Sequence, residues 1–322
     1  MAENGRIPTL HITANSVPQA YYRALKKVHE EGLSIRTQYD RKDIEGNYID
    51  PPSRDAKVMI EITDPFSQPR FPRLSYCEIG KYIAEFLGVK DHLVVPFEKL
   101  RKMVSSNKEF EATEWPYCYH QRLCAYPSSY DGKPINQLEN VVDKLSKDII
   151  TRRAVVITAV PEIDLFMKQD MPCLREIQFR AIENQKGELI LNTHAVWRSR
   201  DLYKAWGDNI IGITNLVQIE IADPLAKKTG RKVIVGPYSE VNGSLHIYGQ
   251  DYSEKGMNKF FDINPDEDTF IKNSMTSKDA IDTRIIPELE ELKKEKTWRL
   301  TERELNIIDK LIEGYKSKKF IP

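Results

Sequence analysis

Cysteine is scarce in this sequence of 322 residues, which contains four: Cys77, Cys118, Cys124 and Cys173. They are too few and too irregularly spaced for a disulfide scaffold, and none belongs to the paired CxxC that binds zinc. The six histidines are also scattered, so we expect no metal site. Each cysteine must therefore be considered singly.

An excess of charge is absent too, since lysine plus arginine and aspartate plus glutamate both number 48. This balance removes the bulk positive charge that promotes non-specific binding to nucleic acids or membranes. The N-terminus has no basic flank followed by an apolar run, and no stretch approaches the roughly 20 apolar residues of a membrane span. We expect a cytoplasmic protein with neither a membrane nor a nucleic acid as partner.

The segments that are present mix helical and strand patterns. Apolar residues at helical spacing predict helices over residues 18–31, 76–87, 135–149 and 209–226. Apolar alternation or short apolar runs predict strands over residues 58–62, 155–160, 174–182, 188–198, 233–235 and 245–248, of which the third and fourth form a hairpin. Residues 38–55 are predicted to form a long charged loop. This mixture favours an α+β fold over a doubly wound sheet.

The C-terminal part of the chain is more charged. Pro287 is predicted to open a helix, and Thr301 with Glu304 forms a capping box ahead of a second one. We therefore expect the C-terminal part of the chain to form a helical extension.

Cys173 is the first candidate for chemistry. It follows Met171 and Pro172, where a loop leads into the strand predicted from residue 174. A cysteine at such a junction is accessible to a ligand, and a nearby guanidinium would favour its thiolate form. A lone cysteine is more often a small buried apolar residue, so this segment alone does not establish a nucleophile.

Two further segments carry polar side chains that could bind a small molecule. Arg198 and Arg200 are predicted to share one strand face beside Ser199, and two guanidinium groups with a hydroxyl can bind a phosphate. His246 and Tyr248 are predicted on one side of another strand, where both could bond a sugar hydroxyl. The ordinary alternatives are a solvent-exposed strand edge for the two arginines and hydrogen-bonded core side chains for His246 and Tyr248.

Taken in order, the motifs PCxxxxQF, RSxD, an asparagine eight residues after that aspartate, and HIY resemble thymidylate synthase. The resemblance runs from about Thr151 to Tyr252, with a weaker likeness back to about Val58, and residues 117–122 are similar to a segment of the shorter archaeal-type members. It implies a mixed sheet covered by helices. The implied catalytic core spans residues 56–265, between an N-terminal helix and charged loop (1–55) and a C-terminal helical appendage (266–322).

The resemblance implies a role for each matching residue. Cys173 would add to C6 of the pyrimidine of a nucleoside monophosphate, which makes C5 nucleophilic toward a one-carbon unit. Arg198 and Ser199 would hold the 5′-phosphate. Arg152 and Arg153 would join them from the partner subunit, so we expect an obligate homodimer.

The resemblance also assigns the residues that surround the base and the sugar. Gln178 and Asp201 would order the pyrimidine site, and His246 with Tyr248 would hold the 3′-hydroxyl. Asn209 would read the base, because a carboxamide can donate to O4 of uracil and accept from its N3–H, whereas cytosine presents the opposite pattern. In the related phage deoxycytidylate hydroxymethylases that position is an aspartate. The sequence therefore favours dUMP as substrate.

The family further uses a carboxylate, a tyrosine and an arginine that closes over the phosphate. Glu78 and Glu85 lie seven residues apart on the predicted 76–87 helix, and we favour Glu78 as the acid–base group near C4. Tyr119 matches the tyrosine that helps to remove the C5 proton. Arg54, ahead of the strand predicted at Val58, is our candidate for the arginine.

The expected co-substrate is 5,10-methylenetetrahydrofolate or a related pterin. Usual members of the family end soon after the HIY segment with a short tail that closes over the folate, whereas this chain continues to Pro322. The tryptophans that line the usual folate site are not evident, although Trp115 could serve.

Several activities therefore stay open. Hydride transfer to an exocyclic methylene intermediate gives a methyl product, and hydration of the same intermediate gives a hydroxymethyl product. We favour thymidylate synthase and keep a dUMP, dCMP or CMP 5-hydroxymethylase as the alternative. A non-catalytic nucleotide-binding regulatory protein would not need Cys173, and a Cys–His hydrolase has no histidine that the sequence assigns to it.

Overall fold

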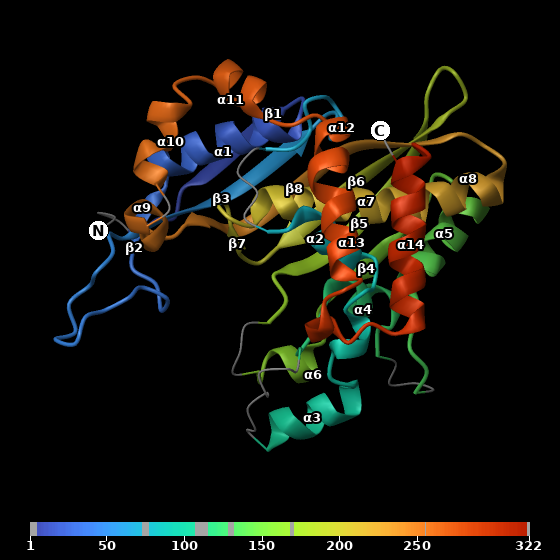
Figure 1. Ribbon diagram of the computed structural model, residues 1–322, viewed down its shortest axis with the longest axis horizontal. Coiled ribbons are helices and arrows are strands. Elements are labelled where there is room, and N and C mark those ends of the chain that lie inside the picture. Colours follow the sequence, from blue (N-terminus) through green and yellow to red (C-terminus); the bar gives the residue numbers. More distant parts are fainter. Residues whose placement is uncertain are drawn as a thin grey trace. The chain divides into compact units, whose positions relative to one another are not determined.

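The computed structural model describes residues 5–72, 77–106, 115–127, 132–167, 171–254 and 256–320. The chain divides into two compact units. The first comprises Met1–Cys77, Val196–Ile210 and Pro237–Lys278, and the second comprises Glu78–Ala195, Ile211–Gly236 and Asp279–Pro322. Helices accompany both parallel and antiparallel strands (Figure 1), so the predicted α+β class is confirmed.

The first unit is built on a mixed sheet. In it β1 (Thr9–Ala14) runs parallel to β3 (Ser53–Ile62). β3 pairs antiparallel with β2 (Leu33–Ile35) and with the part of β8 (Val233–Ile247) that belongs to this unit. The short β7 (Arg200–Asp201) runs parallel to β8. In Figure 1, α1 (Val17–Glu31) lies along β1 and β3 and contacts α11 (Glu267–Asn273). The remaining helices of this part of the chain are α9 (Gly249–Glu254), α10 (Met257–Ile263) and α12 (Ser277–Ala280).

The second unit holds the strands β4 (Val155–Ile157) and β5 (Leu174–Glu183), which are antiparallel, and β6 (Leu189–Trp197) as far as Ala195. The α-helix α7 (Trp206–Leu216) leads the chain into this unit from the first. The other helices are α2 (Ile79–Phe86), η1 (Asp91–Leu93), α3 (Phe97–Ser105), α4 (Tyr119–Cys124), α5 (Gln137–Lys147), α6 (Pro161–Asp164), η2 (Val217–Ala222), α8 (Asp223–Thr229), η3 (Ile281–Ile285), α13 (Ile286–Leu292), η4 (Lys296–Trp298) and α14 (Glu302–Lys316).

Local sequence signals account for several of these elements. Ser16 caps α1 by accepting a hydrogen bond from the Gln19 amide, and Pro18 lies in the first turn, where no intrahelical donor is needed. The predicted capping box is present at the start of α14, where Glu304 accepts from the Thr301 amide at 3.1 Å. The predicted hairpin is confirmed as β5 and β6.

Other predictions were wrong in extent. The two short strands predicted at 233–235 and 245–248 are parts of one continuous strand, β8, and β1 was not predicted. The strand predicted at 155–160 ends at Ile157, since Pro161 already opens α6. The helix predicted over 209–226 is α7, a π-helical turn and α8 in succession. The helix predicted from residue 76 begins at Ile79, and Tyr76 lies outside the described residues.

Candidate active site

Cys173 directly precedes β5 and is half-buried, which confirms its predicted place at a loop–strand junction. The loop before it is fixed by Arg175, whose Nη1 donates to the carbonyl oxygen of Pro172 at 3.2 Å. Arg175 also lies 3.7 Å from Asp164, a fully buried carboxylate that pairs with Arg122 at 2.9 Å. Because a buried ion pair cannot shift without exposing an unpaired charge, it anchors the loop that carries the cysteine.

Tyr119 opens α4 in the same unit as Cys173. The backbone N–H of Leu174 donates to the Tyr119 hydroxyl at 3.5 Å, so the phenol lies beside the residue that follows Cys173. Its ring packs against Phe86, with centroids 5.6 Å apart. The structure thus brings together the predicted nucleophile and the predicted tyrosine.

Glu78 occupies the N-cap of α2 and is exposed. Its carboxylate pairs with Lys81 at 2.9 Å, whereas the half-buried Glu85 pairs with Lys90 at 2.6 Å. Ion pairs of this kind are common in proteins and do not indicate catalysis, so the catalytic role of Glu78 stays a prediction.

Gln178 lies on β5 and donates through Nε2 to the carbonyl oxygen of Arg152 at 3.2 Å. This bond joins the strand after Cys173 to the segment that contains the two predicted phosphate-binding arginines. The side chains of Arg152 and Arg153 are exposed.

In the first unit, Arg198 and Ser199 lie in the bend between β6 and β7. Arg198 Nη1 donates to the Ser199 hydroxyl at 3.4 Å. The prediction that Arg198 and Arg200 share a strand face was wrong, because the strand is interrupted between them. Arg198 is half-buried, whereas Arg200 is only 2% exposed.

Arg200 belongs to a buried network that sequence reasoning missed. Its Nη1 donates to Glu240, its Nη2 donates to the carbonyl oxygen of Trp206 at 3.1 Å, and its Nε donates to Oδ1 of Asn209 at 3.0 Å. The guanidinium also lies over the ring of Trp197, 3.9 Å from its centroid. These contacts hold the carboxamide oxygen of Asn209 toward Arg200.

Asp201 follows on β7, and its Oδ1 accepts from the Lys204 amide at 2.9 Å. Burial raises the pKa of Asp201 to about 6, and the nearby Asp251 acts in the same direction. Lys204 pairs with Asp251 at 2.7 Å. The charge of Asp201 therefore changes close to neutral pH.

His246 lies on β8 opposite Asp55 of β3. Ser244 donates its hydroxyl proton to Asp55 at 2.9 Å. The Ser244 oxygen can then only accept from Nδ1 of His246, which lies 3.2 Å away, so the ring proton is on Nδ1. Nε2 is then a buried acceptor with no partner in the described structure. Burial lowers the pKa of His246 to about 4, and Arg198 and Lys204 add to this effect. The neutral imidazole can accept a hydrogen bond from a ligand hydroxyl.

Tyr248 and Arg54 are placed differently. The ring of Tyr248 meets that of His246 edge-on, with centroids 4.5 Å apart. This contact agrees with the prediction that the two side chains lie on one side of a strand. Arg54 does not precede its strand as predicted, because β3 begins at Ser53. Its Nη1 donates to the carbonyl oxygen of Gly32 at 3.2 Å.

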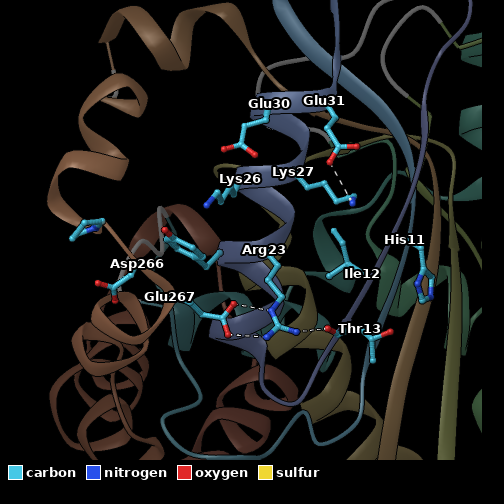
Figure 2. Close-up of a pocket in the computed structure, with 12 residues that line it drawn as sticks. His11, Ile12, Thr13, Arg23, Lys26, Lys27, Glu30, Glu31, Asp266 and Glu267 are labelled. Carbon is cyan, nitrogen blue, oxygen red and sulfur yellow. Dashed lines mark hydrogen bonds and ion pairs between the residues drawn. The ribbon is translucent and has the colours of Figure 1, made fainter.

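The first unit also has a hollow of about 550 Å³ beside α1. Figure 2 shows that charged side chains line it and that Arg23 reaches Glu267 and the carbonyl oxygen of Thr13. Lys27 pairs with Glu31 at 3.3 Å on the same helix. None of the predicted site residues lines this hollow, so it is not the candidate active site.

Within the described residues, no helix has the length and apolar character needed to cross a membrane. Across the same ranges, no three histidine, cysteine, aspartate or glutamate side chains are arranged so that they could hold a metal ion.

Comparison with known proteins places these observations in a family. The family model for thymidylate synthase matches residues 101–321, which is more than half of the chain. A Methanocaldococcus jannaschii protein named "Putative thymidylate synthase" is 30% identical over 243 residues, covering 74% of this chain and 90% of that protein. A protein of the same name from Methanococcoides burtonii is 24% identical over 245 residues, covering 76% and 91%.

A phage protein is similar over a shorter region. The deoxyuridylate hydroxymethyltransferase of Bacillus phage SP01 is 29% identical over 141 residues, which is 42% of this chain and 34% of the phage protein. The chain belongs to the thymidylate synthase family, whose members transfer one-carbon units to pyrimidine nucleotides. The family match continues through α14, beyond the region in which the motifs revealed the resemblance.

Proposed function

We propose that this chain is a thymidylate synthase that methylates C5 of dUMP through a covalent bond between Cys173 and C6. The observation that carries the proposal is local: a half-buried cysteine in an anchored loop, with the Tyr119 hydroxyl on the amide of the next residue. Membership in the family supplies the reaction for which this arrangement is suited.

Each residue then has a defined task in the proposed reaction. The thiolate of Cys173 adds to C6, and the electron pair of the C5–C6 bond moves to C5 and the C4 carbonyl. Once C5 has bonded to the one-carbon unit, Tyr119 helps to remove the C5 proton, and the bond between this carbon and its carrier breaks to leave an exocyclic methylene. A hydride from the co-substrate would then reduce the methylene to a methyl group as the bond to Cys173 breaks and the C5–C6 double bond returns. Glu78 is assigned the proton transfers at C4.

The nucleotide would be held by residues that the family motifs assign to one substrate. Arg198 and Ser199 would bind the 5′-phosphate, with Arg54 as the further candidate. The partnerless Nε2 of His246 suits a 3′-hydroxyl donor, and Tyr248 is assigned to the same hydroxyl. Gln178 and Asp201 would order the pyrimidine.

Uracil rather than cytosine is the base that Asn209 favours. Its Oδ1 accepts from Arg200, which fixes the orientation of the carboxamide, and the second lone pair of this oxygen can accept the N3–H of uracil. The amide nitrogen is the donor that O4 requires.

The co-substrate would be 5,10-methylenetetrahydrofolate or a related pterin, which supplies the carbon and, for methylation, the hydride. Trp115 fits such a molecule, because its indole is 40% exposed and Lys90 lies 4.1 Å from its ring centroid. An aromatic ring system can stack on the face of the indole that Lys90 does not cover.

We also infer a homodimer in the cytoplasm. The exposure of Arg152 and Arg153 supports the dimer, because side chains that complete a partner's phosphate site must extend from their own subunit. The scarcity of cysteine and the balanced charge support the location.

The test is mass spectrometry of the product formed from dUMP and methylenetetrahydrofolate. We expect a methylated nucleotide together with dihydrofolate, no product from Cys173→Ala, and normal product from Cys77→Ala, in which another half-buried cysteine is removed. A hydroxymethylated nucleotide with tetrahydrofolate would instead identify a hydroxymethylase, the alternative that the phage relative favours. Inert protein, also with dCMP, CMP and other pterins, would favour a regulatory nucleotide-binding role.

A further inference from the structure

A second cysteine–histidine group lies in the second unit, and its chemistry does not depend on that of Cys173. Cys124 and His120 are one helical turn apart in α4 and share a face. The sulfur of Cys124 lies 3.3 Å from Nε2 of His120, and Nδ1 of His120 lies 2.7 Å from Oδ2 of Asp91. A thiol, an imidazole and an orienting carboxylate in this order form the constellation that activates cysteine nucleophiles.

The imidazole of this group is held in its charged form. Burial alone would lower the pKa of His120, but hydrogen bonds with Asp91 and Cys124 outweigh it and raise the pKa to about 10. Both ring nitrogens then carry protons at neutral pH, and Nε2–H donates to the sulfur of Cys124. Gly88 allows the close packing, since a Cβ atom there would lie 2.7 Å from Cε1 of the ring.

The same carboxylate distinguishes two cysteines at the ends of one short helix. Cys118 donates its thiol proton to Oδ1 of Asp91 at 3.0 Å and is only 2% exposed. Burial and the charge of Asp91 raise the pKa of Cys118 well above its ordinary value. Cys118 therefore remains a thiol, whereas the sulfur of Cys124 accepts a charged hydrogen bond.

Cys124 also opens onto a pocket. A cavity of about 470 Å³ in the second unit is lined by His120 and Cys124, by Arg303 and Lys310 of α14, and by Glu220. The positive side chains outnumber the single carboxylate. Arg303 lies 3.7 Å from Asp91 and 3.1 Å from Glu304 but is 57% exposed, so its guanidinium can also reach a ligand.

We propose that Cys124 is a thiol-modification site that reacts with small anionic disulfides bound by Arg303 and Lys310. The thiol of Cys124 releases its proton to solvent, its sulfur attacks one sulfur of the ligand, the ligand's S–S bond breaks, and a mixed disulfide forms. The other half leaves as a thiolate with the electron pair and takes a proton from solvent. Cys124 is oxidised as the leaving sulfur is reduced, and attack by a further thiol reverses the step.

The first experiment compares two disulfides of opposite charge on the full-length chain. Oxidised glutathione carries carboxylates, and cystamine carries ammonium groups. Peptide mass spectrometry would follow the rate of adduct formation at each cysteine. We expect oxidised glutathione to modify Cys124 faster than it modifies Cys77 and Cys118. At Cys124 we also expect oxidised glutathione to react faster than cystamine, once each rate is divided by the rate of the same reagent with a free cysteine peptide.

Two sets of variants separate the roles of charge and activation. Arg303→Gln with Lys310→Gln changes exposed side chains and should slow glutathione adduct formation several-fold without slowing cystamine. His120→Asn should slow both reagents by roughly tenfold, because the charged hydrogen bond to the sulfur is lost. Circular dichroism would establish that each variant is folded.

The proposal fails if Cys124 reacts no faster than Cys77, or if the Arg303→Gln and Lys310→Gln changes leave the ratio of the two reagents unaltered. Neither outcome bears on the reaction proposed for Cys173, because the readout is an adduct on Cys124 and not turnover of a nucleotide.

Discussion

The buried carboxylate of Glu240 offers the sharpest test of what holds the first unit together. Glu240 has no exposed surface and accepts from the side chains of Arg200, Trp206, Tyr238 and Asn242. The last three of these bonds measure 2.6, 2.8 and 2.8 Å. Glu240→Gln keeps the shape of the side chain but removes the charge and presents an amide donor to a cluster of donors.

We expect this variant to lose about 3–5 kcal/mol of stability, because it leaves the guanidinium of Arg200 buried without its counter-charge. An amide group that faces another donor would add to this cost. Urea unfolding followed by tryptophan fluorescence is a suitable assay, since Trp197 and Trp206 both contact Arg200. The midpoint should fall while the slope of the transition stays constant.

Glu188→Gln is the matched control. Glu188 pairs with Lys232 at 2.7 Å, but the lysine side chain is 69% exposed. Removing an exposed pair should cost about 0–1 kcal/mol. A loss below about 1 kcal/mol for Glu240→Gln as well would refute the reasoning, because buried and exposed pairs would then be equivalent.

A double-mutant cycle would apportion the effect. Arg200→Met and Glu240→Leu should each destabilise strongly, but together they should cost much less than the sum, because neither buried charge remains unpaired. Additive losses would mean that the two groups do not interact as the structure indicates.

The remaining predictions concern single side chains. Asn209→Asp should shift kcat/KM from dUMP toward dCMP, since an aspartate lacks the donor for O4 of uracil; an unchanged ratio would contradict its assigned role. Thr301→Ala should cost about 1 kcal/mol in thermal unfolding, because α14 loses its N-cap, whereas Glu302→Ala should change stability little. Burial lowers the pKa of His246 to about 4 from 6.5, so its stabilising contribution is complete above pH 6.5 and is lost as the pH falls toward 4. Burial alone would lower the pKa of His120, but its hydrogen bonds with Asp91 and Cys124 raise the pKa to about 10. The contribution of His120 to stability is therefore complete below pH 6.5 and is lost as the pH rises through 10. In His246→Asn and His120→Asn, the urea midpoint should no longer change with pH over the range that corresponds to the histidine removed.

Elements fixed by local chemistry could be predicted from the sequence. The helix α1 has a serine cap, a proline in its first turn and a buried apolar stripe, and each of these signals lies within the segment itself. The same holds for the capping box of α14 and for the hairpin. The missed strand β1 also carried a usable signal, because Leu10, Ile12 and Ala14 alternate with exposed residues.

Strand β8 could not be predicted in this way. Pro237 and the pair Asn242 and Gly243, which are typical of turns, lie between the two short strands that were predicted. In the structure the strand passes through them, and from Tyr238 to Ile247 it pairs with β3 and absorbs a register shift near Ala56. Gly243 is required there, since a Cβ atom would lie 2.8 Å from the carbonyl oxygen of Arg198. Non-local pairing overrode the local preference.

The candidate site shows the same division. The junction at Cys173 follows from residues next to it in the sequence, and the structure confirms it. The contact between Tyr119 and Leu174 joins segments 55 residues apart, and no spacing rule predicts it. The tautomer of His246 depends on Asp55, which is more distant still in the sequence.

The two arginines of the RSRD motif show why residue type alone was insufficient. Both were predicted to lie on one strand face, where they could bind a phosphate, but the strand is interrupted at Arg198 and Ser199 and the two arginines lie in different surroundings. Arg198 stays half-buried beside the serine, whereas Arg200 enters the core, where Glu240 neutralises it and Asn209 receives one of its hydrogen bonds. A buried ion pair adds little stability over an apolar pair of the same size. The ion pair between Arg200 and Glu240 nevertheless has a geometric consequence. It holds Arg200 where its guanidinium fixes which atom of the Asn209 carboxamide is the acceptor.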